Sequence, residues 1–297
     1  MTQVTADARA RARALRAWSH SASGWTGLAL ATPMILLVGV FVLYPLVRVF
    51  IEASSDGDPF GRYLAVFTDP ISRRALTTTL LDSLIVTVVC LVAGLALAWT
   101  LHTTTSRALR VLLWTVALIP MWMGVIVKNY SIFILLSTNG PLNAVLQALG
   151  LTEEPLSLLY NDFAVVFGIS YSLIPYAFLS LYATVINIDT GLLSAARALG
   201  AGRLRALWTI AVPMARGGLV ASGSLVFVLS IGFYVTPILL GGPQTAFMAT
   251  QINQQLNARY DFAGASASAA VLLVIAAVIV GLALALVGGR TLRRALR

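Results

Sequence analysis

The sequence predicts an all-α polytopic membrane protein with six transmembrane helices. Hydrophobic residues make up 59% of the 297 residues and charged residues only 10%, whereas soluble domains carry roughly 25% charged residues. Mean hydropathy is +0.88, and each apolar run is long enough to cross a hydrocarbon core of about 30 Å. These runs leave no room for a soluble domain. We therefore expect one membrane domain over residues 28–289, between basic tails at 1–27 and 290–297.

Polar or basic connections separate the apolar runs and place the expected spans. The spans are residues 28–50, 80–101, 111–136, 163–186, 217–240 and 265–287. Proline and glycine predict interruptions, because they weaken or break helices. We expect a break in the third span near Pro120, one in the fourth at Pro175 and one in the fifth at Pro237. The fifth span should end at Gly241-Gly242-Pro243.

Basic residues predict how the spans are oriented. The two tails, the 102–110 turn and the segment up to Arg216 hold 14 arginines, whereas the connections on the other side hold five. The positive-inside rule then places both termini in the cytoplasm. The net charge of +9 lies at span ends, which favours anionic lipid over nucleic acid as its partner. The Arg-rich, acid-poor start also fits an organellar transit peptide, although a basic juxtamembrane tail is the favoured interpretation.

Residues for catalysis or metal binding are not grouped in this sequence. Cys90 is the only cysteine, and His20 and His102 are far apart, so neither a disulfide nor a ligand set is expected. The sequence has no Gly-rich Walker loop, and no span carries a carboxylate paired at helical spacing with a second carboxylate or a histidine. We expect no catalytic residue, no metal and no cofactor in this chain. An intramembrane enzyme would need such a pair.

Polar side chains inside the spans are the candidates for a solute path, because an ionisable group at mid-bilayer costs about 2.5–3.5 kcal/mol. An acid and several tyrosines suit a cationic amine, through charge pairing and cation–π contact. Asp82 is equally consistent with a group at the membrane interface that does not line a path. Lys128 is more typical of a structural residue that pairs with a carboxylate or reaches the outer interface. The candidates are Asp82, Asn129, Tyr171, Tyr176, Ser230 and Tyr234.

The segment Leu192–Pro213 differs from its apolar surroundings because small residues and arginines alternate in it. Apolar and small side chains from Leu192 to Leu199 share one helical face, and Gly200 is a natural helix stop. A second short helix is expected from Gly202 to Ala211, ended by Pro213. Two short helices joined by a glycine indicate a docking segment.

This segment resembles the "EAA" loop of ABC-importer permeases, whose pattern is E-A-A-x-x-x-G, nine residues, then I-x-L-P. The matching positions are Ser194-Ala195-Ala196, Gly200, Ile210 and Pro213, with Ser194 in place of the glutamate and Val212 in place of the leucine. Residues 118–146, 226–243 and 261–274 are similar to the spermidine/putrescine-type branch of that family.

The resemblance implies a type I importer bundle with a cytoplasmic coupling helix in a bacterial inner membrane. It implies four kinds of partner: a second homologous permease subunit, an ATPase dimer that holds ATP and Mg²⁺, an external solute-binding protein and anionic lipids. The residues implied in ATPase docking are Ser194, Ala195, Ala196, Arg197, Gly200, Arg203, Arg205 and Pro213.

A polyamine is the first candidate for the solute. Aminoethylphosphonate, opine-like or amino-acid-like compounds remain open within the same branch. An ATP-independent six-helix channel and a scaffold without a solute path are the alternatives from other classes.

Overall fold

The computed structural model describes residues 24–55, 60–202, 205, 207–242 and 245–295, and every regular element in these ranges is helical. The predicted all-α fold is thereby confirmed. The chain divides into two compact units, Met1–Glu52 and Ala53–Arg297, which are described separately. The expected basic tail at residues 1–27 falls mostly outside the described residues.

The first unit is one long apolar helix interrupted by a wide turn. It consists of α2 (Gly24–Val38), a π-helical turn (Gly39–Leu43) and α3 (Tyr44–Glu52). The π-helical turn ends two residues before Pro45, which has no amide proton to donate, and the wider turn accommodates this loss. The stretch Ala31–Glu52 is long and apolar enough to cross a membrane, in agreement with the predicted first span.

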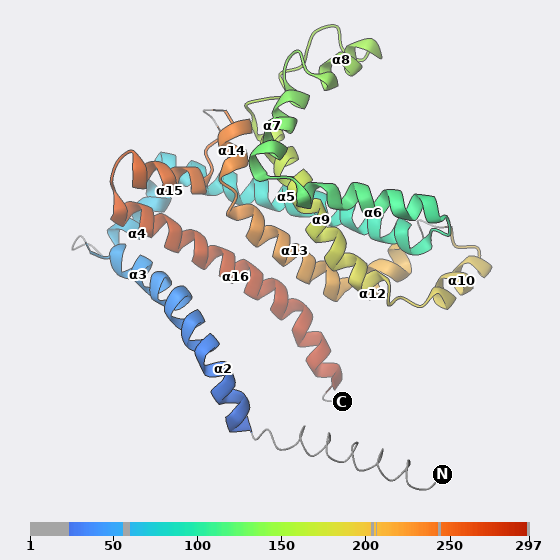
Figure 1. Cartoon of the computed structure of the whole chain (residues 1–297), viewed down its shortest axis with the longest axis horizontal. Coiled ribbons are helices and arrows are strands. Elements are labelled where there is room, and N and C mark those ends of the chain that lie inside the picture. Colours follow the sequence, from blue (N-terminus) through green and yellow to red (C-terminus); the bar gives the residue numbers. More distant parts are fainter. Residues whose placement is uncertain (1–23, 56–59, 203–204, 206, 243–244, 296–297) are drawn as a thin grey trace, which may run out of the picture. The chain divides into compact units, whose positions relative to one another are not determined.

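The second unit contains the remaining helices (Figure 1). They are α4 (Gly61–Thr68), α5 (Pro70–Thr103), α6 (Arg107–Trp122), α7 (Val125–Leu136), α8 (Pro141–Ala148), α9 (Asp162–Val185), α10 (Thr190–Ala198), a π-helical turn (Leu207–Ala211), α12 (Val212–Met214), α13 (Arg216–Ile231), α14 (Val235–Leu240), α15 (Met248–Asn257) and α16 (Phe262–Ala295).

In the described part of the chain, four helical stretches qualify as spans: Ala31–Glu52, α5, α9 and residues 262–285 of α16. Two bent helix pairs bring the number to six if each pair is one span.

The third span bends a few residues later than the sequence predicts. Pro120 lies inside α6, and the break comes at Met123 and Gly124, where the chain turns by 111° into Val125–Ala148. Pro120 lies two residues before the end of α6, so it removes only one hydrogen bond from the last turn and the helix continues through it. The extended conformation of Gly124 (φ −58°, ψ 145°) then starts the new direction.

The fourth span is not broken at Pro175, contrary to the prediction. α9 continues through this residue to Val185. Pro175 is buried, and residues two and three positions beyond it pack directly against Gly94 of α5. We attribute the continuity to that packing, because neighbouring helices compensate for a missing hydrogen bond inside a membrane bundle.

The fifth span breaks just before Pro237, as the sequence predicts, and its second part ends at Leu240, next to Gly241. α13 ends at Ile231 and α14 starts at Val235, with Pro237 as the third residue of α14. Proline is tolerated in a first turn because its missing N–H would have no helical partner there, whereas it prevents the helix from continuing upstream. Pro243 lies outside the described residues.

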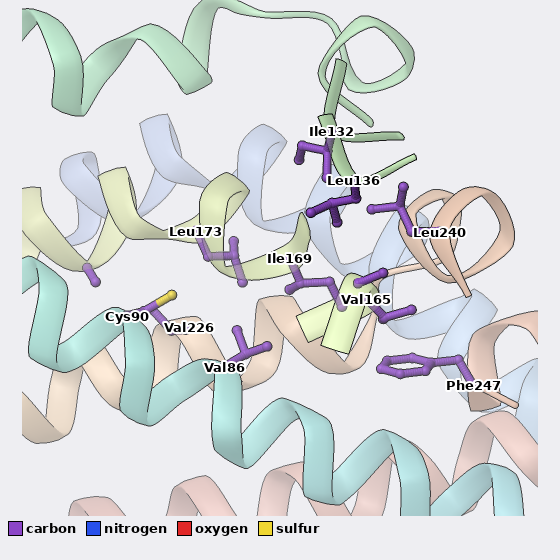
Figure 2. Packing of buried hydrophobic residues seen from close by; sticks show 12 residues of the cluster. Val86, Cys90, Ile132, Leu136, Val165, Ile169, Leu173, Val226, Leu240 and Phe247 are labelled. Atoms are coloured by element: carbon purple, nitrogen blue, oxygen red, sulfur yellow. The ribbon is translucent and has the colours of Figure 1, made fainter. Parts of the chain in front are cut away.

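The core of the second unit lies between α5, α9 and α13. α5 and α9 run in the same direction, because Cys90 contacts Ser170 and Gly94 contacts Ala177 further along both helices. A Cβ at Gly94 would lie 2.9 Å from the backbone nitrogen of Phe178, so only glycine permits this approach. Figure 2 shows the apolar cluster of this core, to which α7, α14 and Phe247 also contribute side chains.

The second unit therefore has two distinct ends. α4, α15 and the N-terminal ends of α5 and α16 meet at one, which we call the α4–α15 end. The C-terminal ends of α5 and α9, together with α10, form the other, which we call the α10 end (Figure 1).

Side chains tie the α4–α15 end together. Arg62 on α4 forms an ion pair with Asp261, at 3.0 Å between Nη1 and Oδ1. The backbone N–H of Met248 donates to the hydroxyl of Thr79 on α5 at 2.7 Å.

Candidate functional site

The segment that the sequence predicts to be a docking segment begins with a capped helix. The backbone N–H of Gly191 donates to Asp189 Oδ1 at 2.7 Å, and the N–H of Leu192 bonds to the Asp189 carbonyl. A carboxylate at this position satisfies amides that have no helical partner and complements the positive end of the helix dipole. Asp189 thus fixes where α10 begins.

Gly200 ends this helix in the conformation that the sequence predicts. Its φ is +85°, in the left-handed region that side chains with a Cβ rarely adopt. The N–H of Ala201 donates to the carbonyl of Ala196 at 2.9 Å, which is the 6→1 bond of a Schellman motif. The chain reverses at a defined point, and this part of the prediction is confirmed.

Large apolar side chains of this segment are uncovered. Leu199, next to the glycine, is 89% exposed and Trp208 is 63% exposed. Leu192 is exposed as well, and so is Met214, the residue that follows the segment. Four uncovered apolar side chains at one end of a bundle are typical of a surface that another protein covers.

The other residues implied in docking are placed as follows. Ala195 and Arg205 are exposed, and Ala196 and Pro213 are half-buried. Ser194 and Arg197 belong to α10, but the structure describes only their backbone, and Arg203 lies outside the described residues.

The second short helix does not stop at Pro213, contrary to the prediction. The π-helical turn Leu207–Ala211 passes directly into α12, which contains Pro213 and ends at Met214. As at Pro45, a wide turn comes just before the proline and accommodates its missing amide proton. The chain bends by 63° between Trp208–Met214 and α13.

Two of the six candidate path residues make hydrogen bonds in the interior of the bundle. Asn129 is fully buried, where it accepts a bond from the Thr236 hydroxyl at 2.7 Å and donates to the carbonyl of Val125 at 2.8 Å. Ser230 is also buried and donates to the carbonyl of Phe227 at 2.9 Å. The Asn129–Thr236 bond ties α7 to α14 beside Gly168 on α9, where a Cβ would collide with both Thr236 and Leu240.

Asp82 is buried without a complete set of partners. Its Oδ2 and the hydroxyl of neighbouring Ser83 have no hydrogen-bond partner among the described residues. Burying a carboxyl group without a full set of hydrogen-bond partners costs free energy, so Asp82 lowers the stability of the bundle at this position. Lys128, on the buried side of α7, is enclosed as well.

The tyrosines among the candidates differ from the other three. Tyr176 on α9 and Tyr234 at the α13–α14 break are exposed on the surface of the second unit. Tyr171 is half-buried, and its hydroxyl donates to the sulfur of Met123 at 3.7 Å. The six candidates thus divide into residues enclosed by the bundle and residues that a solute outside it can reach.

Sequence reasoning missed Gly168, whose lack of a side chain leaves room for Thr236 beside Asn129. A glycine in mid-span was the only available indication, since such a residue often marks a close approach of helices.

Known proteins resemble this chain in sequence and in fold. A family model described as "Binding-protein-dependent transport system inner membrane component" matches residues 90–294. The spermidine/putrescine transport system permease protein PotB of Escherichia coli (strain K12) is 31% identical over 253 residues, which cover 85% of this chain and 90% of PotB. PotB of Salmonella typhimurium (strain LT2) is equally identical, over 85% of this chain and 86% of its own.

Solved structures share the fold at lower identity. One is a bacterial ABC transporter involved in import of the acidic polysaccharide alginate, with a TM-score of 0.74 and 20% identity over 95% of this chain and 100% of that one. The alginate transporter in complex with its pentasaccharide-bound periplasmic protein gives a TM-score of 0.75, at 20% identity over 91% and 97% of the two chains. On the family match and the PotB identity, this chain belongs to the binding-protein-dependent inner-membrane permeases and is a permease component of an ABC importer.

Proposed function

We propose that this chain imports a small cationic solute of the polyamine type. ATP hydrolysis powers the import, and the segment Leu192–Pro213 transmits the movement of the ATPase to this chain. A separate cytoplasmic ATPase dimer, which holds ATP and Mg²⁺, docks on this segment. The observation that carries the proposal is the glycine-capped turn at the α10 end, where Leu199 and Trp208 are uncovered. Burying one such side chain against a partner stabilises the contact by about 1.5–3 kcal/mol.

The arginine distribution supports an orientation in which the α10 end faces the cytoplasm together with both termini. The opposite end then faces an external solute-binding protein. Arg205 is exposed, so trypsin should cleave beside it in inside-out vesicles and leave it intact in right-side-out vesicles.

A second homologous permease subunit supplies the other wall of the path. The bundle is packed between α5, α9 and α13, whereas Tyr176 and Tyr234 face outward. A path lined by these tyrosines therefore lies against the surface of this chain. The enclosed residues Asp82, Asn129 and Ser230 shape that surface from within.

The polyamine assignment is supported by the similarity to PotB and by the exposed tyrosines, whose ring faces attract cations. The alginate transporter has the same fold, which shows that the fold itself does not select the solute.

The test is ATP hydrolysis by the reconstituted complex of this chain, the second permease and the ATPase, with the binding protein added. Spermidine or putrescine should stimulate hydrolysis only when the binding protein is present. Stimulation by an aminophosphonate or amino acid instead would overturn the substrate and keep the coupling mechanism. Solute flux without nucleotide would indicate a channel.

Gly200→Val should remove this stimulation while leaving membrane insertion intact, because valine is strained at φ +85°. Gly202→Val is the matched control: a Cβ at either glycine has no heavy atom within 4 Å, but Gly202 is not among the glycines with positive φ. Equal stimulation in the two variants would argue against a coupling role for the glycine turn.

A further inference from the structure

A small polar cavity of about 190 Å³ lies at the α4–α15 end of the second unit. α4, the start of α5, α15 and the start of α16 form its walls. Charged residues of both signs line it, two arginines (Arg62 and Arg259) and two aspartates (Asp69 and Asp261). A pocket of this size is smaller than the cavities that hold drug-sized ligands, so it suits a small ion or headgroup.

Two glutamines of α15 present amides to this cavity. Gln251 is 5% exposed, and its side chain makes no hydrogen bond within the described part of the chain. Gln255, one helical turn later and 8% exposed, accepts from the hydroxyl of Ser268 at 3.1 Å, which leaves its amide N–H₂ without a described partner. Neither amide is among the enclosed polar atoms that lack a partner, so both open into the cavity, where a ligand can supply acceptors and donors to them.

The charges around the cavity are only partly paired. Asp261 bonds to Arg62 and to the backbone N–H of Gly264. Asp69 accepts from the N–H of Ser72 at 2.8 Å, which lowers the pKa of its carboxyl, and the charge of Arg259 lowers it further. Asp69 and Arg259 nevertheless do not form an ion pair. A carboxylate and a guanidinium thus face one cavity with a gap between them.

We propose that this cavity binds a small zwitterion in which a primary ammonium and an oxyanion are separated by a few atoms. The ammonium lies at Asp69, and the oxyanion lies at Arg259 and the Gln251 amide. Such a ligand bridges the gap between the two charges, and it supplies partners for the glutamine amides. A phosphoethanolamine group has this chemistry, whether as the headgroup of phosphatidylethanolamine or as a free solute. The proposal does not depend on coupling to ATP hydrolysis.

The test is isothermal titration calorimetry on the purified, delipidated transporter complex with four probes: dihexanoyl-phosphatidylethanolamine, phosphoethanolamine, inorganic phosphate and ethanolamine. The two zwitterions should bind saturably, with one site per chain, and the two half-molecules should not. Binding of only the short-chain lipid would assign the site to a headgroup, and binding of both zwitterions would extend it to free solutes.

Arg259→Gln and Asp69→Asn should each weaken zwitterion binding at least about tenfold, the loss expected for one charge-assisted hydrogen bond. Asparagine still caps a helix, so the start of α5 remains intact in the second variant. Arg73→Gln is the matched control, because Arg73 is exposed on the same turn of α5 and does not line the cavity. Unchanged affinity in both test variants, equal binding of phosphate alone, or no binding of either zwitterion would overturn the proposal.

Discussion

The two ends of the second unit are stabilised by different means. At the α4–α15 end, side chains join separate elements, as in the Arg62–Asp261 ion pair and the bond from Met248 to Thr79. At the α10 end, the chain is shaped mainly by local backbone bonds around Gly200 and keeps large apolar side chains uncovered. One end is thus tied to the bundle by its own contacts. The other end has a defined shape and a surface suited to a partner.

The parallel helices α5 and α9 connect the two ends, so the largest effect is expected where they touch. A valine at Gly94 would place its Cβ 2.9 Å and 3.0 Å from backbone atoms of Phe178 and Ala177, which no rotamer change relieves. We expect a loss of about 1–3 kcal/mol of stability, measured as a lower melting temperature and a lower yield of complex. Gly281→Val, at an exposed position of α16 with nothing within 4 Å, should leave both unchanged.

A more selective effect, on association with a partner and not on the stability of the chain, is expected at the α10 end. Leu199→Gln should weaken association with the ATPase about tenfold or more, because burial of a leucine contributes about 1.5–3 kcal/mol. The melting temperature of the chain itself should hardly change, since the side chain is exposed. Leu149→Gln, at another exposed leucine beyond α8, is the control. Equal weakening by both substitutions would indicate a non-specific surface effect.

The smallest effect is expected for the ion pair at the α4–α15 end. Asp261→Asn should lower stability by about 0.2–1 kcal/mol, as is usual for a partly exposed pair. Asp261→Ala should cost more, because it also removes the acceptor for the N–H of Gly264. Neither variant should alter ATPase association. A loss of ATPase affinity comparable to that of Leu199→Gln would contradict the division of roles between the ends.

Composition and local chemistry predicted much of the fold. Hydropathy located the apolar segments because burial in lipid requires long apolar runs whatever their neighbours are. Proline was a less reliable guide. Pro175 leaves α9 intact, whereas Pro237 accompanies a break between α13 and α14. The difference is tertiary, because Pro175 is enclosed where α9 packs on α5, and no sequence pattern reveals that contact.

The candidate site shows the same limit. The conformation of Gly200 followed from the sequence because a helix end is a local structure. The polar residues in the spans gave no such information, because burial depends on which face of each helix meets a neighbour. Asn129 is enclosed by Thr236, more than a hundred residues away, whereas Tyr176 reaches the surface from the same helix that carries Gly168.

Cys90 is the single cysteine of the chain, and it is buried with its sulfur 3.6 Å from the carbonyl oxygen of Ser170. The natural protein is therefore almost a cysteine-free background for site-directed spectroscopy. A pair of thiols introduced at the two ends would be the accessible ones, and spin or fluorescence labels on them would report the separation of the ends during a transport cycle.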